Sequence, residues 1–381
     1  MAKQSSSIKD IIRNARPLEE LSTLRPEFAD IVGIWENELA PELGVRESVR
    51  RQTVSRAKTR TGIAIALVAL PTIAIMILSG GPDFIFPLAF FFAVLVIMAL
   101  SGFDWLKVYS MKNATKDLVL QAACRPFGFH YNTLLPDVTG IDNLETLIAR
   151  SKQWASEATE SEKTIHTVFG DIKVSVQNSK GQPPPTPAYD LLDKAGLLPS
   201  HDSRNFEDLI EGERAGAKFA LVEAKLTTSG DKSSKTVFQG ILIHIAYPQR
   251  FTGRTLIARS GWWKRGKGAG DLKKVDLISR ELEEAFTVYS SDQVEARALL
   301  SPDRMERLIA LERHFAGGKL RGLFHEGHMT LALEAPNQFE AGSVFEPLVD
   351  PRRFSSALSE LGLVCDLIDG FFTREWVQGR I

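Results

Sequence analysis

The chain has 381 residues, with 46 Lys and Arg against 47 Asp and Glu, a formal net charge of -1 and a mean hydropathy close to zero. This length allows two or three domains, each with its own core. The balanced charge creates no whole-molecule field that would attract nucleic acid, so we expect no nucleic-acid partner. Cys124 and Cys365 stand far apart without a metal-ligand spacing, which excludes a disulfide framework and a zinc finger.

Residues 1–60 form a polar and basic N-terminal segment in which a helix is expected. Apolar side chains recur there at steps of three and four residues, at Phe28, Ile31, Val32, Trp35 and Leu39. This spacing predicts an amphipathic helix. We expect its apolar face to pack against the soluble part of the protein or against a second subunit, and contact with a membrane surface is the alternative.

The segment 61–102 contains two long apolar runs. Between residues 61 and 103 the only charged side chain is that of Asp83. The runs, 62–79 and 84–101, would each extend about 25 Å as a helix, close to the hydrocarbon thickness of a bilayer. A soluble pair of helices would have to be buried on every face, which a domain of this size rarely provides. The sequence therefore predicts a transmembrane hairpin whose tip is the SGGPD turn at 79–83.

Basic residues lie on both flanks of this hairpin and are absent from its tip. The flanking cations are Arg46, Arg50, Arg51, Arg56, Lys58 and Arg60 before it, and Lys107, Lys112 and Lys116 after it. Such a distribution predicts that both termini face the cytoplasm. Trp105 and Tyr109 follow the second run, at positions typical of interfacial aromatic residues. We therefore expect a multi-pass protein of a bacterial inner membrane.

Beyond the hairpin the chain divides into a stalk, a linker and a domain. We expect a stalk and helical region over 103–177, with a charged helix from 141 to about 168, and a proline-rich linker over 178–188. The segment 189–381 is predicted to form a cytoplasmic domain with strands over 217–228, 236–247, 255–259 and 273–278, a helix from Ser301, a hairpin turning at Glu326 and Gly327, and a final helix over 354–371. Strands in series with helices beside them are typical of an α+β fold with a mostly antiparallel sheet.

Several stretches of this domain occur in a recognisable order. They read YDLLDKAGLL (189–198), FEDLIEGERAGAKFALVEAKL (206–226), VFQGILIHI (237–245) and FTVYSSDQVEARALLSPDRMERL (286–308). Together with the preceding hairpin, they resemble a bacterial two-span membrane-protein family known as domain of unknown function 3137. The resemblance extends from about residue 50 onward, although 150–188 fits it poorly. It implies an inner-membrane protein with a cytoplasmic domain and brings no activity, cofactor or catalytic residue.

The string FHEGH (324–328) is the strongest candidate for catalytic chemistry. A helical metalloprotease motif places two histidines four residues apart so that both imidazoles point the same way. His325 and His328 are three residues apart in a predicted hairpin, so we expect a solvated turn, with a metal site as the alternative. With His244 and nearby carboxylates, these histidines are the basis of an alternative function, a membrane-anchored hydrolase.

The loop GWWKRGKGAG (261–270) combines aromatic and basic side chains. It lacks the spacing of a phosphate-binding loop. Adjacent indoles and cations are typical of contact with anionic lipid headgroups, and a loop without a partner is the alternative. The candidate membrane-interface residues are Trp105, Tyr109, Trp262, Trp263, Lys264 and Arg265.

The acidic string Glu207, Asp208, Glu211 and Glu213 has an ordinary and a functional interpretation. We expect an exposed short helix or turn, because adjacent carboxylates are common there. A cation site or an acid–base pair is the alternative.

These patterns favour a membrane-anchored cytoplasmic binding or scaffold module. We assign it no catalytic residue, metal or cofactor. Its expected partners are the lipid bilayer and an unidentified protein, and self-association is left open. A pore or transporter is disfavoured because the two spans contain no ionisable residue that could line a polar route.

Overall fold

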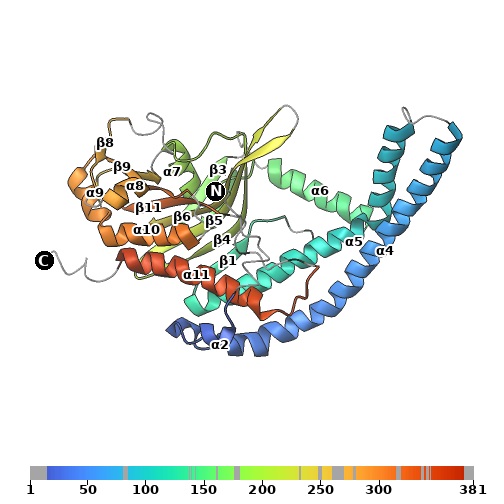
Figure 1. Ribbon diagram of the computed structural model, residues 1–381, viewed down its shortest axis with the longest axis horizontal. Helices are drawn as coiled ribbons and strands as arrows, with labels where there is room; N and C mark the ends of the chain where they lie inside the picture. Colours follow the sequence, from blue (N-terminus) through green and yellow to red (C-terminus); the bar gives the residue numbers. More distant parts are fainter. Residues whose placement is uncertain are drawn as a thin grey trace.

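The computed structural model describes residues 15–79, 85–136, 138, 140–141, 143–159, 162–175, 181–230, 233–247, 251–259, 270–277, 280–314, 319–335, 339, 343 and 345–372. A large antiparallel sheet with flanking helices forms the body, and two long paired helices extend from it (Figure 1). The predicted α+β class, with a mostly antiparallel sheet, is confirmed.

The N-terminal segment forms a series of short helices that leads into a long one. These are α2 (Leu18–Leu21), the 3-10 helix η1 (Pro26–Phe28), α3 (Ile31–Ile34) and the π-helical turn η2 (Trp35–Leu39). The predicted apolar face is buried, and the Trp35 ring stacks on Phe354 of α11 (Pro351–Phe372) with centroids 6.4 Å apart. This segment therefore packs on the body of the protein.

Helices α4 (Ala40–Ser79) and α5 (Ile85–Cys124) lie side by side along their length (Figure 1). Helix α5 continues beyond residue 103 to Cys124. Of the predicted tip, 79–83, Ser79 ends α4 and residues 80–83 lie outside the described residues. Within the described part of the chain, no helix has both the length and the hydropathy of a membrane span.

Among the described residues, nine strands form the main sheet, and every neighbouring pair is antiparallel. Their spatial order is β1 (His130–Thr133), β4 (Ser203–Arg214), β5 (Ala217–Ser229), β6 (Ser234–Ala246), β11 (His328–Glu334), β10 (Arg321–His325), β7 (Thr255–Arg259), β9 (Phe286–Ser290) and β8 (Lys273–Val275). Strand β1 comes from the segment 103–177, so the sheet also includes residues before the proline-rich stretch.

The segment between β1 and β4 differs from its prediction. Helix α6 (Leu144–Thr159) ends well before residue 168, and β2 (Glu162–Thr167) and β3 (Gly170–Ser175) form a separate two-stranded sheet. From Gly181, the proline-rich stretch lies against the body, where Pro184 and Pro185 are buried and Gly181 bridges to β4. This part is therefore not a spacer extended into solvent.

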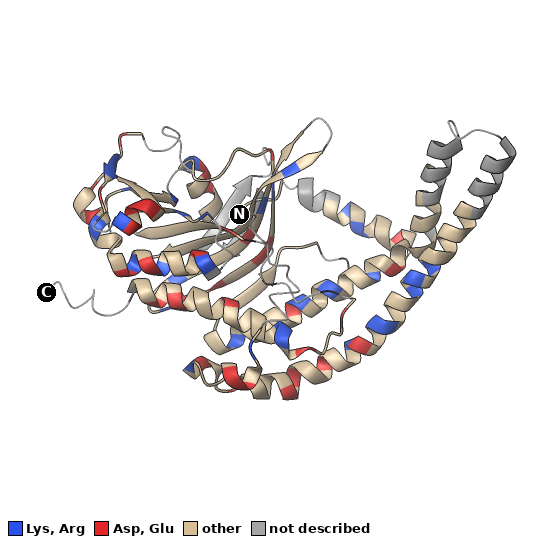
Figure 2. Cartoon of the chain, viewed as in Figure 1, with Lys and Arg blue, Asp and Glu red and all other residues tan. Residues whose placement is uncertain are grey.

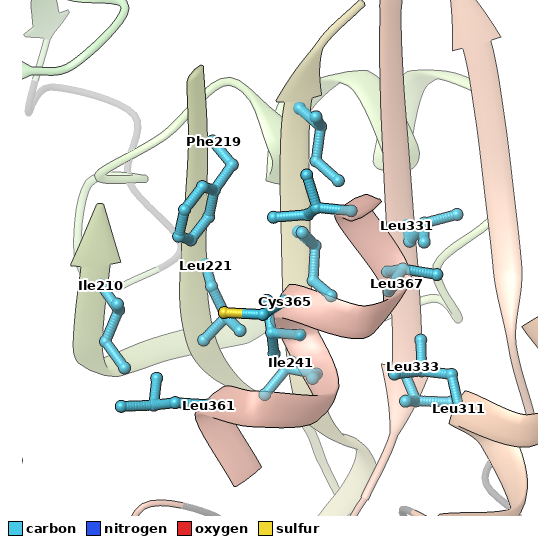
Figure 3. Close-up of a cluster of buried hydrophobic side chains, with 14 of the residues drawn as sticks. Ile210, Phe219, Leu221, Ile241, Leu311, Leu331, Leu333, Leu361, Cys365 and Leu367 are labelled. Atoms are coloured by element: carbon cyan, nitrogen blue, oxygen red, sulfur yellow. The ribbon is translucent and has the colours of Figure 1, made fainter. Parts of the chain in front are cut away.

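The sheet is covered on both faces. Along β6, Ile241, Ile243 and Ile245 face one core and Leu242 faces the other, as the period of two in a strand requires. Helix α11 covers the first face, where Leu361 and Cys365 lie over Ile210, Leu221 and Ile241 (Figure 3). Helix α7 (Ala188–Lys194) covers the second. Full burial of each large aliphatic side chain contributes about 2 kcal/mol to this core.

The remaining helices are η3 (Arg125–Phe127), α8 (Arg280–Ala285), α9 (Gln293–Leu299) and α10 (Pro302–His314). The β10–β11 hairpin turns at Glu326 (φ 49°) and Gly327 (φ 74°), and the predicted turn position is confirmed. Two positive φ angles in a two-residue connection are typical of a hairpin turn.

Candidate functional site

The base of the α4–α5 pair, where its charged part meets its uncharged part, contains the two described candidate interface residues. Val54 and Ala57 of α4 pack there on Val108 of α5, with Trp105 against them. Farther along the pair, Ala64 and Ser101 are fully buried. Small side chains at a contact let two helix backbones approach closely, so the two helices pack as one unit.

Two polar contacts cross between the helices at this boundary. The Trp105 indole Nε1 donates to Thr61 Oγ1 at 3.0 Å, and Arg60 Nη1 donates to Asp104 Oδ2 at 2.8 Å. Asp104 is buried, whereas Arg60 is half exposed. Tyr109, one turn into the charged part, is 42% exposed. Trp105 and Tyr109 therefore lie at the end of the apolar run, and their contact with a membrane interface stays a prediction.

A third aromatic ring joins this boundary from the segment before α11. Phe345 is 55% exposed, and its ring centroid lies 6.0 Å from that of Trp105. The Lys58 ammonium lies 5.2 Å from the centre of the same ring, within the range of a cation–π contact. Sequence reasoning missed Phe345, because no local pattern links residue 345 to a hairpin more than two hundred residues earlier.

Glu47 connects the base of α4 to that same segment. Its carboxylate accepts hydrogen bonds from Arg50 at 2.7 and 2.8 Å, from Arg51 at 2.7 Å and from the Leu348 backbone N–H at 2.9 Å. The hydrogen bonds from Arg50, with those from Leu348 and Arg51, lower the pKa of Glu47 to about 2. The carboxylate is therefore charged at neutral pH and holds the hairpin base against the body.

The loop with the other four candidate residues, Trp262, Trp263, Lys264 and Arg265, lies outside the described residues. Their contact with lipid headgroups stays a prediction.

The prediction of an exposed helix or turn for the acidic string is wrong, because these residues lie in strand β4. Asp208 is fully buried and Glu211 nearly so. A β-bulge between Phe206 and Leu209 interrupts the alternation of apolar and polar residues, which is why the string does not read as a strand. Glu213 is exposed, as expected.

Asp208 belongs to a buried polar cluster between β4, β5 and α5. Its Oδ2 lies 2.6 Å from Lys116 Nζ, and its Oδ1 accepts a hydrogen bond from the Tyr131 hydroxyl at 2.8 Å. Carboxylate oxygens of Glu207, Asp208 and Glu223 lie within 4.8 Å of one another. Because the Lys116 ammonium already neutralises Asp208, this cluster fits an internal ion pair that joins α5 to the sheet better than a metal centre.

Three histidines from the sequence analysis lie near the β10–β11 turn. His244 is buried, and its ring stacks on His328 with centroids 4.8 Å apart and planes inclined by 10°. Burial, with the nearby His328, lowers the pKa of His244 to about 3, and its Nδ1 lies 2.9 Å from Thr330 Oγ1. His325 lies opposite His328 in the hairpin register.

This histidine group lacks the geometry of a hydrolytic site. Stacked parallel rings do not direct their nitrogen lone pairs at one point, as metal binding requires. A relay of nucleophile, base and carboxylate needs hydrogen bonds in series. His244 contacts the hydroxyl of Thr330, but the carboxylate of Glu326 lies beside a different histidine, His325, at 3.7 Å from its Nε2, so these groups do not form one series.

Two open grooves lie on the surface of the described residues. One, of about 720 Å³, runs along the edge strand β1 between Leu118 of α5 and Glu211 of β4. Burial raises the pKa of Glu211, which accepts a hydrogen bond from the Val168 N–H at 3.0 Å. The second groove, of about 630 Å³, follows α4 from Arg51 to Arg60.

Comparison with known proteins finds one family model that matches part of the chain. The model of the family described as "Protein of unknown function (DUF3137)" matches residues 236–372, from β6 to the end of α11. No curated protein matches the chain. The crystal structure of the mycobacterial trehalose monomycolate transport factor A, TtfA, aligns with 43% of this chain and 73% of that chain at 13% identity, with a TM-score of 0.21. The family match supports a domain of unknown function in this region.

Proposed function

We propose that the protein is a membrane-anchored cytoplasmic binding or scaffold module of a bacterial inner membrane, with 62–79 and 84–101 as its two spans. The observation that carries this proposal is the boundary at the base of the α4–α5 pair. Uncharged sequence begins at Thr61, and two interhelical hydrogen bonds, with Trp105 and Phe345, gather at this level. Aromatic rings and cations beside an uncharged helical pair are typical of a membrane–water boundary.

Contacts between the two ends of the described chain support the proposed orientation. Arg25 forms an ion pair with Asp366 of α11, and the Ser355 hydroxyl donates to the Arg16 carbonyl. Arg214 of β4 binds both Glu27 and Asp369. Because the segment before the hairpin packs on the last helix, both must lie on the same side of a bilayer. A chain that crosses the bilayer twice has both ends on the same side. The basic residues on both flanks favour the cytoplasmic side.

The body is connected to the proposed anchor in a way that suits a scaffold. Helix α5 continues from the uncharged part into the sheet contacts of Lys116, and Glu47 holds α4 to the segment before α11. The groove beside β1 begins near Leu118, about 25 Å along α5 from residue 101. A protein partner bound in this groove would be held at a fixed distance from the bilayer.

The test is the extraction and topology of the full-length protein in cells. We expect the protein to sediment with the membrane fraction and to remain there after extraction with alkaline carbonate. A cysteine in Ser79→Cys, at the proposed tip, should react with an impermeant maleimide from the periplasm. Gly44→Cys, on an exposed face of α4, should react only after the inner membrane is opened. Release by carbonate, or periplasmic labelling of Gly44→Cys, would refute the proposal.

A further inference from the structure

One face of α4 just before the uncharged run is a stripe of cations and small polar groups. Arg51, Arg56 and Arg60 are exposed along it, and the shallow groove that they line also includes Gln52, Ser55 and Thr59. These positions recur at four- and five-residue steps and therefore share one side of the helix. The opposite side, with Val54 and Ala57, packs on α5. Blue bands mark this stretch of α4 below the uncharged part of the pair (Figure 2).

The stripe lines its groove with positive charge and no carboxylate. Arg51 forms an ion pair with Glu47, and Arg60 forms one with Asp104 of α5. Both of these carboxylates are buried, Glu47 against the body and Asp104 against α4. Within the described ranges, Arg56 has no acidic partner. Its guanidinium therefore keeps five donors for a ligand of opposite charge, with the hydroxyls of Ser55 and Thr59 nearby in the groove.

The spacing along the helix places this groove at headgroup depth in the proposed orientation. Arg60 directly precedes the uncharged run, and Arg56 and Arg51 lie about 6 Å and 14 Å farther along the helix axis. The headgroup layer extends roughly 5 to 8 Å beyond the hydrocarbon. Arg56 and Arg60 fall within this layer, whereas Arg51, which pairs with Glu47, lies beyond it and adds only positive potential.

We propose that this groove binds the phosphate of an anionic phospholipid of the cytoplasmic leaflet. Arg56 makes the direct contact, Arg51 and Arg60 contribute positive potential, and the hydroxyls of Ser55 and Thr59 donate to phosphate oxygens. Guanidinium groups bind phosphate through paired N–H donors, which makes arginine well suited to this ligand. The inference rests on the proposed function, because only an anchored α4 has such lipids beside it.

The experiment measures lipid enrichment around the full-length protein in nanodiscs of mixed phosphatidylcholine and phosphatidylglycerol. Lipids retained after transfer to detergent are counted by native mass spectrometry. We expect the wild-type protein to retain phosphatidylglycerol preferentially and Arg56→Gln to reduce this preference about fivefold, the effect of one interfacial cation. The matched control is Arg280→Gln, which removes the same charge from an exposed position on α8 and should leave the preference unchanged.

Each outcome bears on one proposal. A protein that never enters nanodiscs would refute the proposed anchor. A protein that enters them without a preference for phosphatidylglycerol, or an Arg56→Gln variant with full preference, would overturn the lipid site alone. An equal loss in Arg280→Gln would also overturn it.

Two further measurements test other ligands. If millimolar inorganic phosphate displaces the bound lipid, the groove is a general anion site. If a photo-crosslinker at position 55 captures an acidic protein, the groove belongs to that protein. Either result contradicts the lipid assignment.

Discussion

The Glu47→Gln substitution tests how the base of the hairpin is attached to the body. The amide would keep the shape of the side chain but lose its negative charge, which removes the ion pair between Glu47 and Arg50, a residue that is 8% exposed. The hydrogen bond to the Leu348 backbone would weaken at the same time. We therefore expect the substitution to destabilise the attachment of α4 to the segment before α11.

The magnitude follows from the pKa of Glu47. A decrease from 4.5 to about 2 corresponds to roughly 3 kcal/mol of favourable interaction with the charged form. Because Arg51 is largely exposed and its share is screened by solvent, we expect a loss of about 2 kcal/mol in the free energy of unfolding at pH 7. Since folding lowers this pKa, the stabilisation is complete above pH 4.5 and is lost as the pH falls through about 2.

The assay is urea denaturation of the full-length protein in detergent, followed by tryptophan fluorescence between pH 7 and pH 3. The difference between wild type and Glu47→Gln should shrink by more than half over this range. Glu42→Gln is the matched control, because Glu42 on the same helix accepts from Arg46 at 3.0 Å but is half exposed. It should cost no more than about 0.5 kcal/mol. Equal losses in the two variants, or a pH-independent loss at Glu47, would refute the reasoning.

Three further outcomes are expected. Gly240→Ala should destabilise the sheet by about 3 kcal/mol in urea denaturation, because its Cβ would lie 2.0 Å from a backbone oxygen of β11; Gly216→Ala, with a φ of 77° and open space around it, should cost only about 1 kcal/mol. Asp292→Ala should lower stability by about 1 kcal/mol, because this carboxylate caps α9; no loss in the thermal midpoint would contradict the cap. Cys124 and Cys365 should resist maleimide at pH 8 until urea is added, because burial raises the pKa of each thiol to about 12; rapid native labelling would show that they are accessible.

The sequence predicted the elements whose pattern is regular. Strand β5 (Ala217–Ser229), strand β6, the β10–β11 turn and helix α11 were all located within a few residues, because the strands are apolar runs joined by a polar turn, the helix has a period of 3.6 and the hairpin turn has a defined composition. Strand β4 was missed because a bulge at residues 207–208 changes the side-chain alternation. Strand β1, at four residues, is too short to show a period.

At the candidate site, the sequence reports only what lies close along the chain. Trp105 and Tyr109 were chosen as candidates because they directly follow an apolar run, and their contact with a membrane stays a prediction. Phe345, the Leu348 contact of Glu47 and the pairing of Lys116 with Asp208 depend on how distant elements pack, which no local spacing reports. The burial of Asp208 was missed for the same reason, since its partner Lys116 comes from another element.

The contact between the first helices and α11 has a consequence for synthesis. Ser355 and Arg16 are 339 positions apart, so an emerging chain contains the N-terminal segment long before the surface that covers it. During translation, the apolar side chains of Phe28, Ile31 and Trp35 remain uncovered until α11, which is synthesised much later, has left the ribosome. A truncated product without α11 would leave this surface uncovered, which is the kind of defect that chaperones and proteases recognise.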